Sequence, residues 1–458
     1  MALYVLLGLA ALFSLRAVTA WRYGFFLMIL LAAVQDPLRK LVPGTPGWLV
    51  LITAPVFLAT VLGAVLRTRG WWPLFKRAYP QVGNALLMLI LLCVPAAILS
   101  ATYGPGSWML TVLGAFSYAS IFLAVITGFH FPRDPKSVRK LLVVYCLAHG
   151  VMLSGAVLEY YEVFPAMQVI GTKAMGFEWM RWGSGYTVDM LAGFYRSPDV
   201  MGWHAAAVCM LSLVLGLAGK GKGRWGWIAL SGLAIIALML CGRRKMVYML
   251  PVFLLALVWI YWQAGRAGRM VAMLGLLLIP VGSVWLVSDQ LSEESANVRY
   301  YSGEGLKFSA MESIQGQGFG AVVETYKQSG VLGEGLGVAT PGSHNLKVAR
   351  PRVWQESAPS RIMVELGVPG TLGFLLVMIG IVLALWRTTI KQLRTRSQSA
   401  PYAAGLFAFF LANVGSLTVS GQILADPFIA AFLGILVGVV LSLVRFQAPK
   451  ANGPSRAV

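Results

Sequence analysis

The sequence predicts an all-α protein, a polytopic bundle of about 12–13 transmembrane helices that forms one integral membrane domain over residues 1–458. Apolar residues make up 58% of the chain and charged residues only 12%, and the mean hydropathy is +0.74. A soluble protein of this length needs far more polar surface. Apolar runs of about 17–25 residues, the length of a membrane-crossing helix, recur along the chain.

Each apolar run predicts one span, bounded by polar residues, glycine or proline. Residues 1–15 lack a basic start and a small-residue cleavage site, so we expect a retained first helix. The thirteen predicted spans are 2–15, 22–35, 47–66, 83–100, 107–129, 141–159, 199–218, 225–241, 246–262, 270–287, 361–386, 401–420 and 426–444.

Basic residues orient these spans. If the spans alternate, five short connections and the C-terminal tail, all rich in lysine and arginine, fall on one side. Because basic loops stay on the cytoplasmic side, we expect that side to be the cytoplasm and the protein to be of the inner-membrane type. The net charge of +20 is spread over these short turns, which argues against a nucleic-acid partner and for contact with anionic membrane lipids.

Two longer connections fall on the opposite, extracytoplasmic side. The first outer loop covers residues 160–198, and the large outer loop covers 288–360. Together they hold 11 of the 17 acidic residues. Polar chemistry is therefore expected on the outer face.

A tight turn at residues 242–245, here called the basic turn, places Arg243, Arg244 and Lys245 between two predicted spans on that outer face. Three cations on the translocated side oppose the usual orientation bias. An anionic ligand approached from outside, such as a lipid diphosphate, would explain them. The alternative is that the three side chains reach toward lipid headgroups.

The large outer loop contains a glycine run with glycines at Gly333, Gly335 and Gly337. Such glycines allow backbone N–H groups to approach an anion closely. The spacing fits neither a P-loop nor a dinucleotide fingerprint, so a plain turn is an equal alternative.

The segment after the glycine run enters a predicted span. Ser357 is placed to cap this helix, and Arg361 and Glu365, four residues apart, share one helix face. Either these two residues form a local ion pair, or Glu356 and Arg361 line a site at the membrane surface.

Polar residues also precede the span at 199–218. Arg196 lies at the membrane interface, and Asp199 lies near a helix N-terminus, where a carboxylate is favourable. His204 lies about one turn deeper, where a packed, hydrogen-bonded histidine is expected.

The basic turn, the G-x-G-x-G stretch at 333–337 and the segment from Glu356 into Glu365-Leu366-Gly367-Val368-Pro369-Gly370 together resemble the O-antigen polymerase and O-antigen ligase superfamily. The likeness covers roughly residues 190–440. It implies an all-helical GT-C-type membrane glycosyltransferase that takes polyprenyl-diphosphate-linked glycans at the outer face, without metal or cofactor. It also implies that outer-face arginines, here Arg243 and Arg244 with Lys245, Arg196 or Arg361, hold the diphosphate.

In that family a His-Asn pair often stands nine residues before the E-L-G helix. Here position 356 is glutamate, and His344-Asn345 stands 21 residues before Glu365. The general base is therefore either Glu356, which we favour, or His344. The acceptor would be a glycan, so the protein could be either an exopolysaccharide polymerase or a ligase. The resemblance also allows a chain-length regulator as a further partner. A lipid-linked oligosaccharide flippase is the alternative from another class, and a scaffold of a secretion complex is a third.

Overall fold

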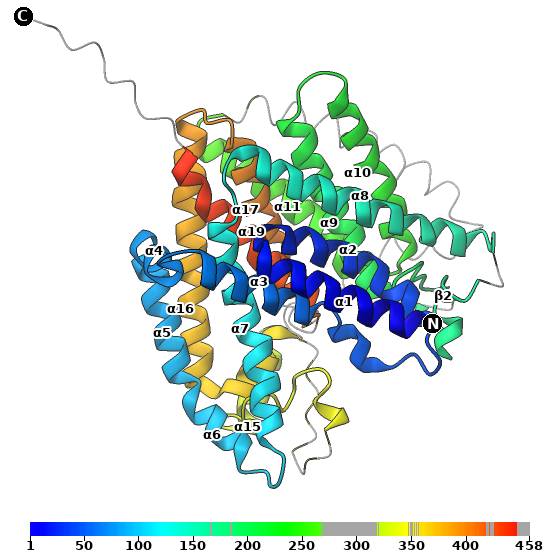
Figure 1. Ribbon diagram of the computed structural model, residues 1–458, viewed down its shortest axis with the longest axis vertical. Helices are drawn as coiled ribbons and strands as arrows, with labels where there is room; N and C mark the ends of the chain where they lie inside the picture. Colours follow the sequence, from blue (N-terminus) through cyan, green and yellow to red (C-terminus); the bar gives the residue numbers. More distant parts are fainter. Residues whose placement is uncertain are drawn as a thin grey trace, which may run out of the picture.

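The computed structural model describes residues 1–266 apart from 165–166 and 184–185, residues 320–346, 357–417 and 426–446, and the single positions 268, 318, 348, 351, 353, 355 and 421 (Figure 1). Within these residues the chain is almost wholly helical, as predicted. Its one described sheet is a two-stranded antiparallel hairpin of β1 (Met180–Gly183) and β2 (Tyr186–Asp189).

The helices of the first half of the chain alternate with short turns. They are α1 (Ala2–Thr19), α2 (Trp21–Lys40), η1 (Gly47–Leu51), α3 (Ala54–Arg67), α4 (Trp71–Ala78), α5 (Pro80–Leu92), α6 (Val94–Ala101), α7 (Trp108–His130), α8 (Pro135–Tyr160), η2 (Lys173–Met175), α9 (Pro198–Ala218), α10 (Gly223–Leu240) and α11 (Arg244–Gln263).

The described helices of the second half include the longest one. They are α15 (Ala321–Ser329), η4 (Ser343–Asn345), α16 (Ala358–Arg394), α17 (Ala400–Leu417), α19 (Pro427–Ser442) and η5 (Leu443–Phe446).

Within the described residues, 11 helices are long and apolar enough to cross a membrane, and each coincides with a predicted span. The chain is therefore a multi-pass helical membrane protein. The predicted span 22–35 forms the continuous 20-residue helix α2, whose charged ends keep it out of that set of 11. The predicted span 270–287 lies outside the described residues.

The structure contains elements that the sequence did not predict. The connection 67–80 contains the short helix α4, and the predicted span 83–100 is divided between α5 and α6 at Cys93. The first outer loop contains the β1–β2 hairpin, and the large outer loop contains α15. Elements of four to nine residues are too short for hydrophobic periodicity to reveal.

The helices pack so that two groups of connections meet at opposite ends of the bundle. At the end that we name the loop end, Lys40 Nζ donates to Gly193 O at 2.9 Å, and the backbone N–H of Leu191 donates to Leu240 O at 3.3 Å. At the basic end, Arg22 Nε donates to Phe131 O at 3.1 Å. These contacts agree with the predicted grouping for the connections that they join; the side of the membrane that each group faces stays a prediction.

Helices α7 and α19 pack side by side and run in the same direction. A Cβ at Gly434 would lie 2.5 Å from Ile121 O and one at Gly438 would meet Val125 O, so the two backbones touch along glycine positions. Since α-helices share one rise per residue, Asp426, just before α19, lies level with the stretch of α7 near Ser117. This packing places the polar residues at the start of α19 and in the first half of α7 at similar depth.

Candidate functional site at the loop end

The basic turn lies against the N-terminus of α9. Arg243 Nη2 is 2.7 Å from Asp199 Oδ2, and Lys245 Nζ is 2.9 Å from Asp199 Oδ1. Asp199 lies in the first turn of α9, as predicted, and the N-cap Ser197 accepts a hydrogen bond from the Val200 N–H at 3.3 Å. The side chains of Arg243 and Lys245 keep 16% and 24% of their surface exposed, so this ion cluster reaches solvent.

The β1–β2 hairpin brings two further residues to the basic turn. The guanidinium of Arg243 stacks 5.4 Å from the centre of the Trp179 ring. Arg181 of β1 is exposed and adds to the positive potential at Lys245. The sequence did not single out Arg181, because only the fold of the hairpin places it beside a turn some sixty residues later in the chain.

Backbone packing fixes the position of the basic turn. Gly242 has φ +66°, and a Cβ there would lie 2.5 Å from Met190 Cγ. Arg244 is the first residue of α11. The structure therefore brings together the basic turn and the segment before α9, two groups that the sequence predicted on one face.

Arg196 lies between two carboxylates rather than facing the basic turn. Its Nη1 is 3.4 Å from Asp36 Oδ1, its backbone N–H donates to Asp36 Oδ2 at 3.1 Å, and its Nη2 contacts Asp426. Burial alone would lower the pKa of Arg196, but the charges of Asp36 and Asp426 outweigh burial and raise the pKa above its usual value. Two carboxylates here would repel a diphosphate, so we assign Arg196 to holding α2, α9 and α19 together.

Of the two alternatives for Arg361, the ion pair with Glu365 is present, with 3.6 Å between Nε and Oε2 and both side chains buried. Glu365 Oε1 accepts hydrogen bonds from the Ala339 N–H at 2.9 Å and the Thr340 hydroxyl at 2.8 Å, and its Oε2 accepts one from the Tyr118 hydroxyl at 2.7 Å. The carboxylate thus ties the end of the glycine run to α16 and α7.

Arg361 is enclosed by the same elements. Its Nη2 donates to Ser117 Oγ at 2.9 Å and to Thr340 Oγ1 at 2.8 Å, and only 2% of the residue is exposed. A buried arginine with internal acceptors stabilises the junction of α7, α16 and the glycine run. A lipid diphosphate could reach it only if this junction opened.

The glycine run is packed between helices. Gly333, Gly335 and Gly337 have φ of +72°, +98° and +91°. A Cβ at Gly335 would lie 2.8 Å from the backbone N of Ser100, and one at Gly337 would meet the Leu110 carbonyl oxygen. These positions need glycine both for the left-handed backbone and for the close approach of α6 and α7.

Backbone N–H groups of the glycine run donate hydrogen bonds to carbonyl oxygens of neighbouring helices. The Glu334 N–H donates to Val364 O at 2.6 Å, and the Leu336 N–H donates to Ala96 O at 3.0 Å. The Tyr103 hydroxyl donates to Glu334 O at 2.7 Å, and burial, with the nearby Glu334 charge, raises the pKa of Tyr103 to about 12. Of the two predicted roles for the run, the packed turn fits these contacts better than an open concavity for an anion.

The structure describes only one of the two candidate bases. His344 lies in the short turn η4 and is exposed, four residues after Thr340, which Glu365 anchors. Glu356 lies outside the described residues. The next residue, Ser357, caps α16 as predicted, accepting from the Ser360 N–H at 3.3 Å.

A buried cluster of rings between α8 and α9 was only partly predicted. His204 Nδ1 lies 2.9 Å from the Tyr145 hydroxyl, as expected for a packed histidine, and His149 Nδ1 lies 3.1 Å from the Tyr195 hydroxyl. The two imidazole rings stack with centroids 3.9 Å apart. His149 Nε2 is buried without a hydrogen-bond partner among the described residues. A histidine within an apolar span is the signal that could have drawn attention to His149.

The fold places the chain in the class of multi-pass helical membrane proteins. Its site is a cationic cluster around the basic turn at the loop end. In the part of the chain that the structure describes, no three His, Cys, Asp or Glu side chains group closely enough to hold a metal ion. A scan against models of known protein families finds no match, and a search of curated proteins finds no related sequence. The resemblance to the O-antigen polymerase and ligase superfamily therefore stays a prediction.

Proposed function

We propose that the protein is a glycosyltransferase that polymerises or transfers polyprenyl-diphosphate-linked oligosaccharides at the outer face of a bacterial inner membrane. One observation carries the proposal: Arg243 and Lys245 both contact the Asp199 carboxylate, and Arg181 lies close enough to Lys245 to add to the positive potential there. The cluster keeps an excess of positive charge at the surface of the bundle, where a membrane-anchored anion can reach it.

Helix geometry adds to that positive charge. Both α9 and α11 begin at this cluster, and a helix N-terminus carries about half a positive charge. Cations in the first turn of α11 oppose its dipole, at a cost of about 0.3–1 kcal/mol each. A bound diphosphate would offset this repulsion, because helix N-termini and arginine guanidinium groups both bind phosphate oxygens favourably.

In the proposed reaction the acceptor hydroxyl oxygen attacks the anomeric carbon of the donor sugar. The bond from that carbon to the diphosphate oxygen breaks, and the electron pair leaves with the polyprenyl diphosphate. Attack from the opposite face inverts the anomeric configuration. Arg243 and Arg244 would stabilise the negative charge that develops on the leaving group.

A base must take the proton of the acceptor hydroxyl, and such catalysis contributes about 10²–10⁴-fold. Glu356 and His344 are the two candidates from the sequence. His344 is exposed and follows the anchored residues 339–340, so the structure leaves it accessible to a substrate at the loop end. Glu356→Gln and His344→Ala, measured in one assay, decide between them: the base variant loses activity at least a hundredfold.

To test whether the cations bind the donor diphosphate, Arg243→Ala and Arg244→Ala are made separately. Each purified variant is assayed with lipid-linked repeat units. We expect each to reduce glycan transfer at least tenfold. Lys220→Ala and Lys222→Ala are matched controls, since these exposed cations occupy a short turn at the opposite end of the bundle. Equal transfer by wild type and both arginine variants would refute the proposal. Longer glycans on the lipid indicate a polymerase, and transfer to a different acceptor indicates a ligase.

The buried histidine and tyrosine cluster favours a second candidate, a lipid-linked oligosaccharide flippase. A transporter requires polar groups within its spans, and His149 and His204 are fully within α8 and α9. In the same reconstituted system a flippase would move the lipid-linked glycan between leaflets without forming a new glycosidic bond. His149→Phe would then abolish movement, whereas it would leave glycan transfer by an enzyme unaffected.

A further inference from the structure

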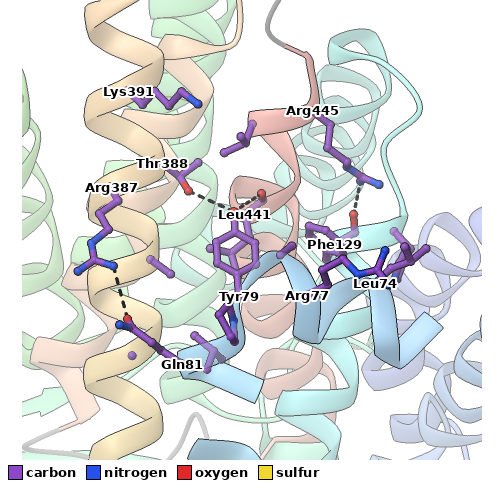
Figure 2. Close-up of a pocket in the computed structure, with 17 residues that line it drawn as sticks. Leu74, Arg77, Tyr79, Gln81, Phe129, Arg387, Thr388, Lys391, Leu441 and Arg445 are labelled. Carbon is purple, nitrogen blue, oxygen red and sulfur yellow. Dashed lines mark hydrogen bonds between the residues drawn. The ribbon is translucent and has the colours of Figure 1, made fainter. Parts of the chain in front are cut away.

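A cavity of about 680 Å³ opens at the basic end of the bundle, and Figure 2 shows the residues that line it. Four elements that are distant in the sequence line it: the α4–α5 junction, the end of α7, the second half of α16, and the end of α19 with η5. Tyr79 holds them together, since its hydroxyl donates to Leu441 O at 2.6 Å and lies 3.3 Å from Thr388 Oγ1. The hollow is therefore built into the fold.

The lining combines cations with an apolar floor. Arg77, Arg387, Lys391 and Arg445 contribute to it, and none of the described lining residues is Asp or Glu. Figure 2 shows Arg387 and Lys391 along one face of α16, with Arg445 on the far side of the cavity. The floor includes Val82, Phe129 and Leu441, so the cavity offers both charge and hydrophobic surface.

The cations have few internal partners. Within the described residues, Arg77, Arg387 and Lys391 form no ion pair, and all three are exposed. Arg387 Nη1 meets only the neutral Gln81 Oε1, at 3.4 Å. Orientation bias places basic residues on one side of a membrane, but it does not gather four of them from three separate helices around one cavity.

We propose that this cavity binds an anionic phospholipid of the adjacent leaflet, with the lipid phosphate among the four cations and the start of an acyl chain on the apolar floor. Basic pockets between membrane helices suit such headgroups, because each Lys or Arg near the surface attracts the anionic lipid. A free phosphate would use the cations but gain nothing from Val82, Phe129 and Leu441. The inference depends neither on the proposed transfer reaction nor on which leaflet the basic end faces.

The test titrates purified full-length protein in detergent with phosphatidylglycerol or phosphatidylcholine and counts bound lipid by native mass spectrometry. We expect wild type to bind phosphatidylglycerol at least tenfold more tightly. Arg387→Gln/Lys391→Gln should remove most of that preference, and Lys391→Gln alone should reduce it about threefold. Because both side chains are exposed, the fold should survive, as circular dichroism checks.

The control is Lys220→Gln/Arg394→Gln, which removes two exposed cations of the same end that do not line the cavity. It should bind lipid as wild type does. Equal binding of the two lipids by wild type, or an unchanged preference in the double variant, would overturn the proposal. So would displacement of phosphatidylglycerol by inorganic phosphate at equal concentration, since the site would then recognise free phosphate rather than lipid.

Discussion

Asp199 Oδ2 and Arg243 Nη2 lie 2.7 Å apart, joining the first turn of α9 to the N-terminus of α11. Lys245 shares the same carboxylate, and the Asp199 side chain is only 8% exposed. Removal of one member of a partly buried ion cluster weakens the pairing of the others, so its members are energetically coupled.

The first prediction concerns this coupling. Asp199→Asn should lower the melting temperature, because it removes the carboxylate charge that Arg243 and Lys245 share. Asp199→Asn/Arg243→Gln should lose less than the sum of the single losses, by about 0.5–3 kcal/mol. Thermal unfolding in detergent of wild type, Asp199→Asn, Arg243→Gln and the double variant measures this coupling energy. Strictly additive losses would show that Asp199 and Arg243 are not coupled.

The second prediction compares a buried and an exposed ion pair. Glu365→Gln removes the charge opposite Arg361 at a site with no exposure, and we expect destabilisation of about 3–5 kcal/mol. Glu324→Gln breaks the exposed pair with Lys327, 2.7 Å apart, and should leave the melting temperature nearly unchanged. Similar effects of the two substitutions would contradict the structural role given to Glu365.

The third prediction separates close packing from backbone conformation in the glycine run. Gly337→Ala must adopt φ +91° and also meet the Leu110 carbonyl. Gly342→Ala has φ +92° with no atom within 4 Å of the new Cβ, so it carries backbone strain alone, about 1–2 kcal/mol. Folded yield and melting temperature should fall clearly further for Gly337→Ala, and equal losses would mean that the run is not packed against α7.

The fourth prediction concerns the parallel pair α7 and α19. Gly434→Ala places a Cβ 2.5 Å from Ile121 O and should separate the helices, lowering the melting temperature. Gly232→Ala, on α10 with open space around the new Cβ, should be neutral or slightly stabilising, since alanine restricts the unfolded chain. A neutral Gly434→Ala would contradict the close contact of the two backbones.

Local pattern was sufficient to predict the spans that the structure describes and the Ser357 cap, and it offered the pairing of Arg361 with Glu365 as one of two alternatives. Each depends on residues within one helix, where hydrophobic runs and the four-residue spacing are direct signals. The same reasoning missed α4 and the β1–β2 hairpin, which are too short to show a period.

Partners supplied by distant segments could not be predicted. Arg196 sits at the interface as expected, but its two carboxylates, Asp36 and Asp426, come from α2 and the start of α19. The glycines of the run at 333–337 were predicted from their conformational freedom, whereas their contacts with Ser100 and Leu110 depend on how α6 and α7 pack. Tertiary packing thus decides which polar residues are enclosed and which remain open to a ligand.

The orientation of the bundle tests the central claim most directly, because an outer-face diphosphate can reach only a loop end that faces outward. Arg181→Cys and Lys222→Cys place exposed thiols at the loop end and the basic end, in a background with Cys93→Ala and the other three cysteines buried. With a membrane-impermeant maleimide on intact spheroplasts, we expect labelling at position 181 and labelling at position 222 only after lysis. The reverse pattern would place Arg243 and Arg244 in the cytoplasm and contradict the proposed function.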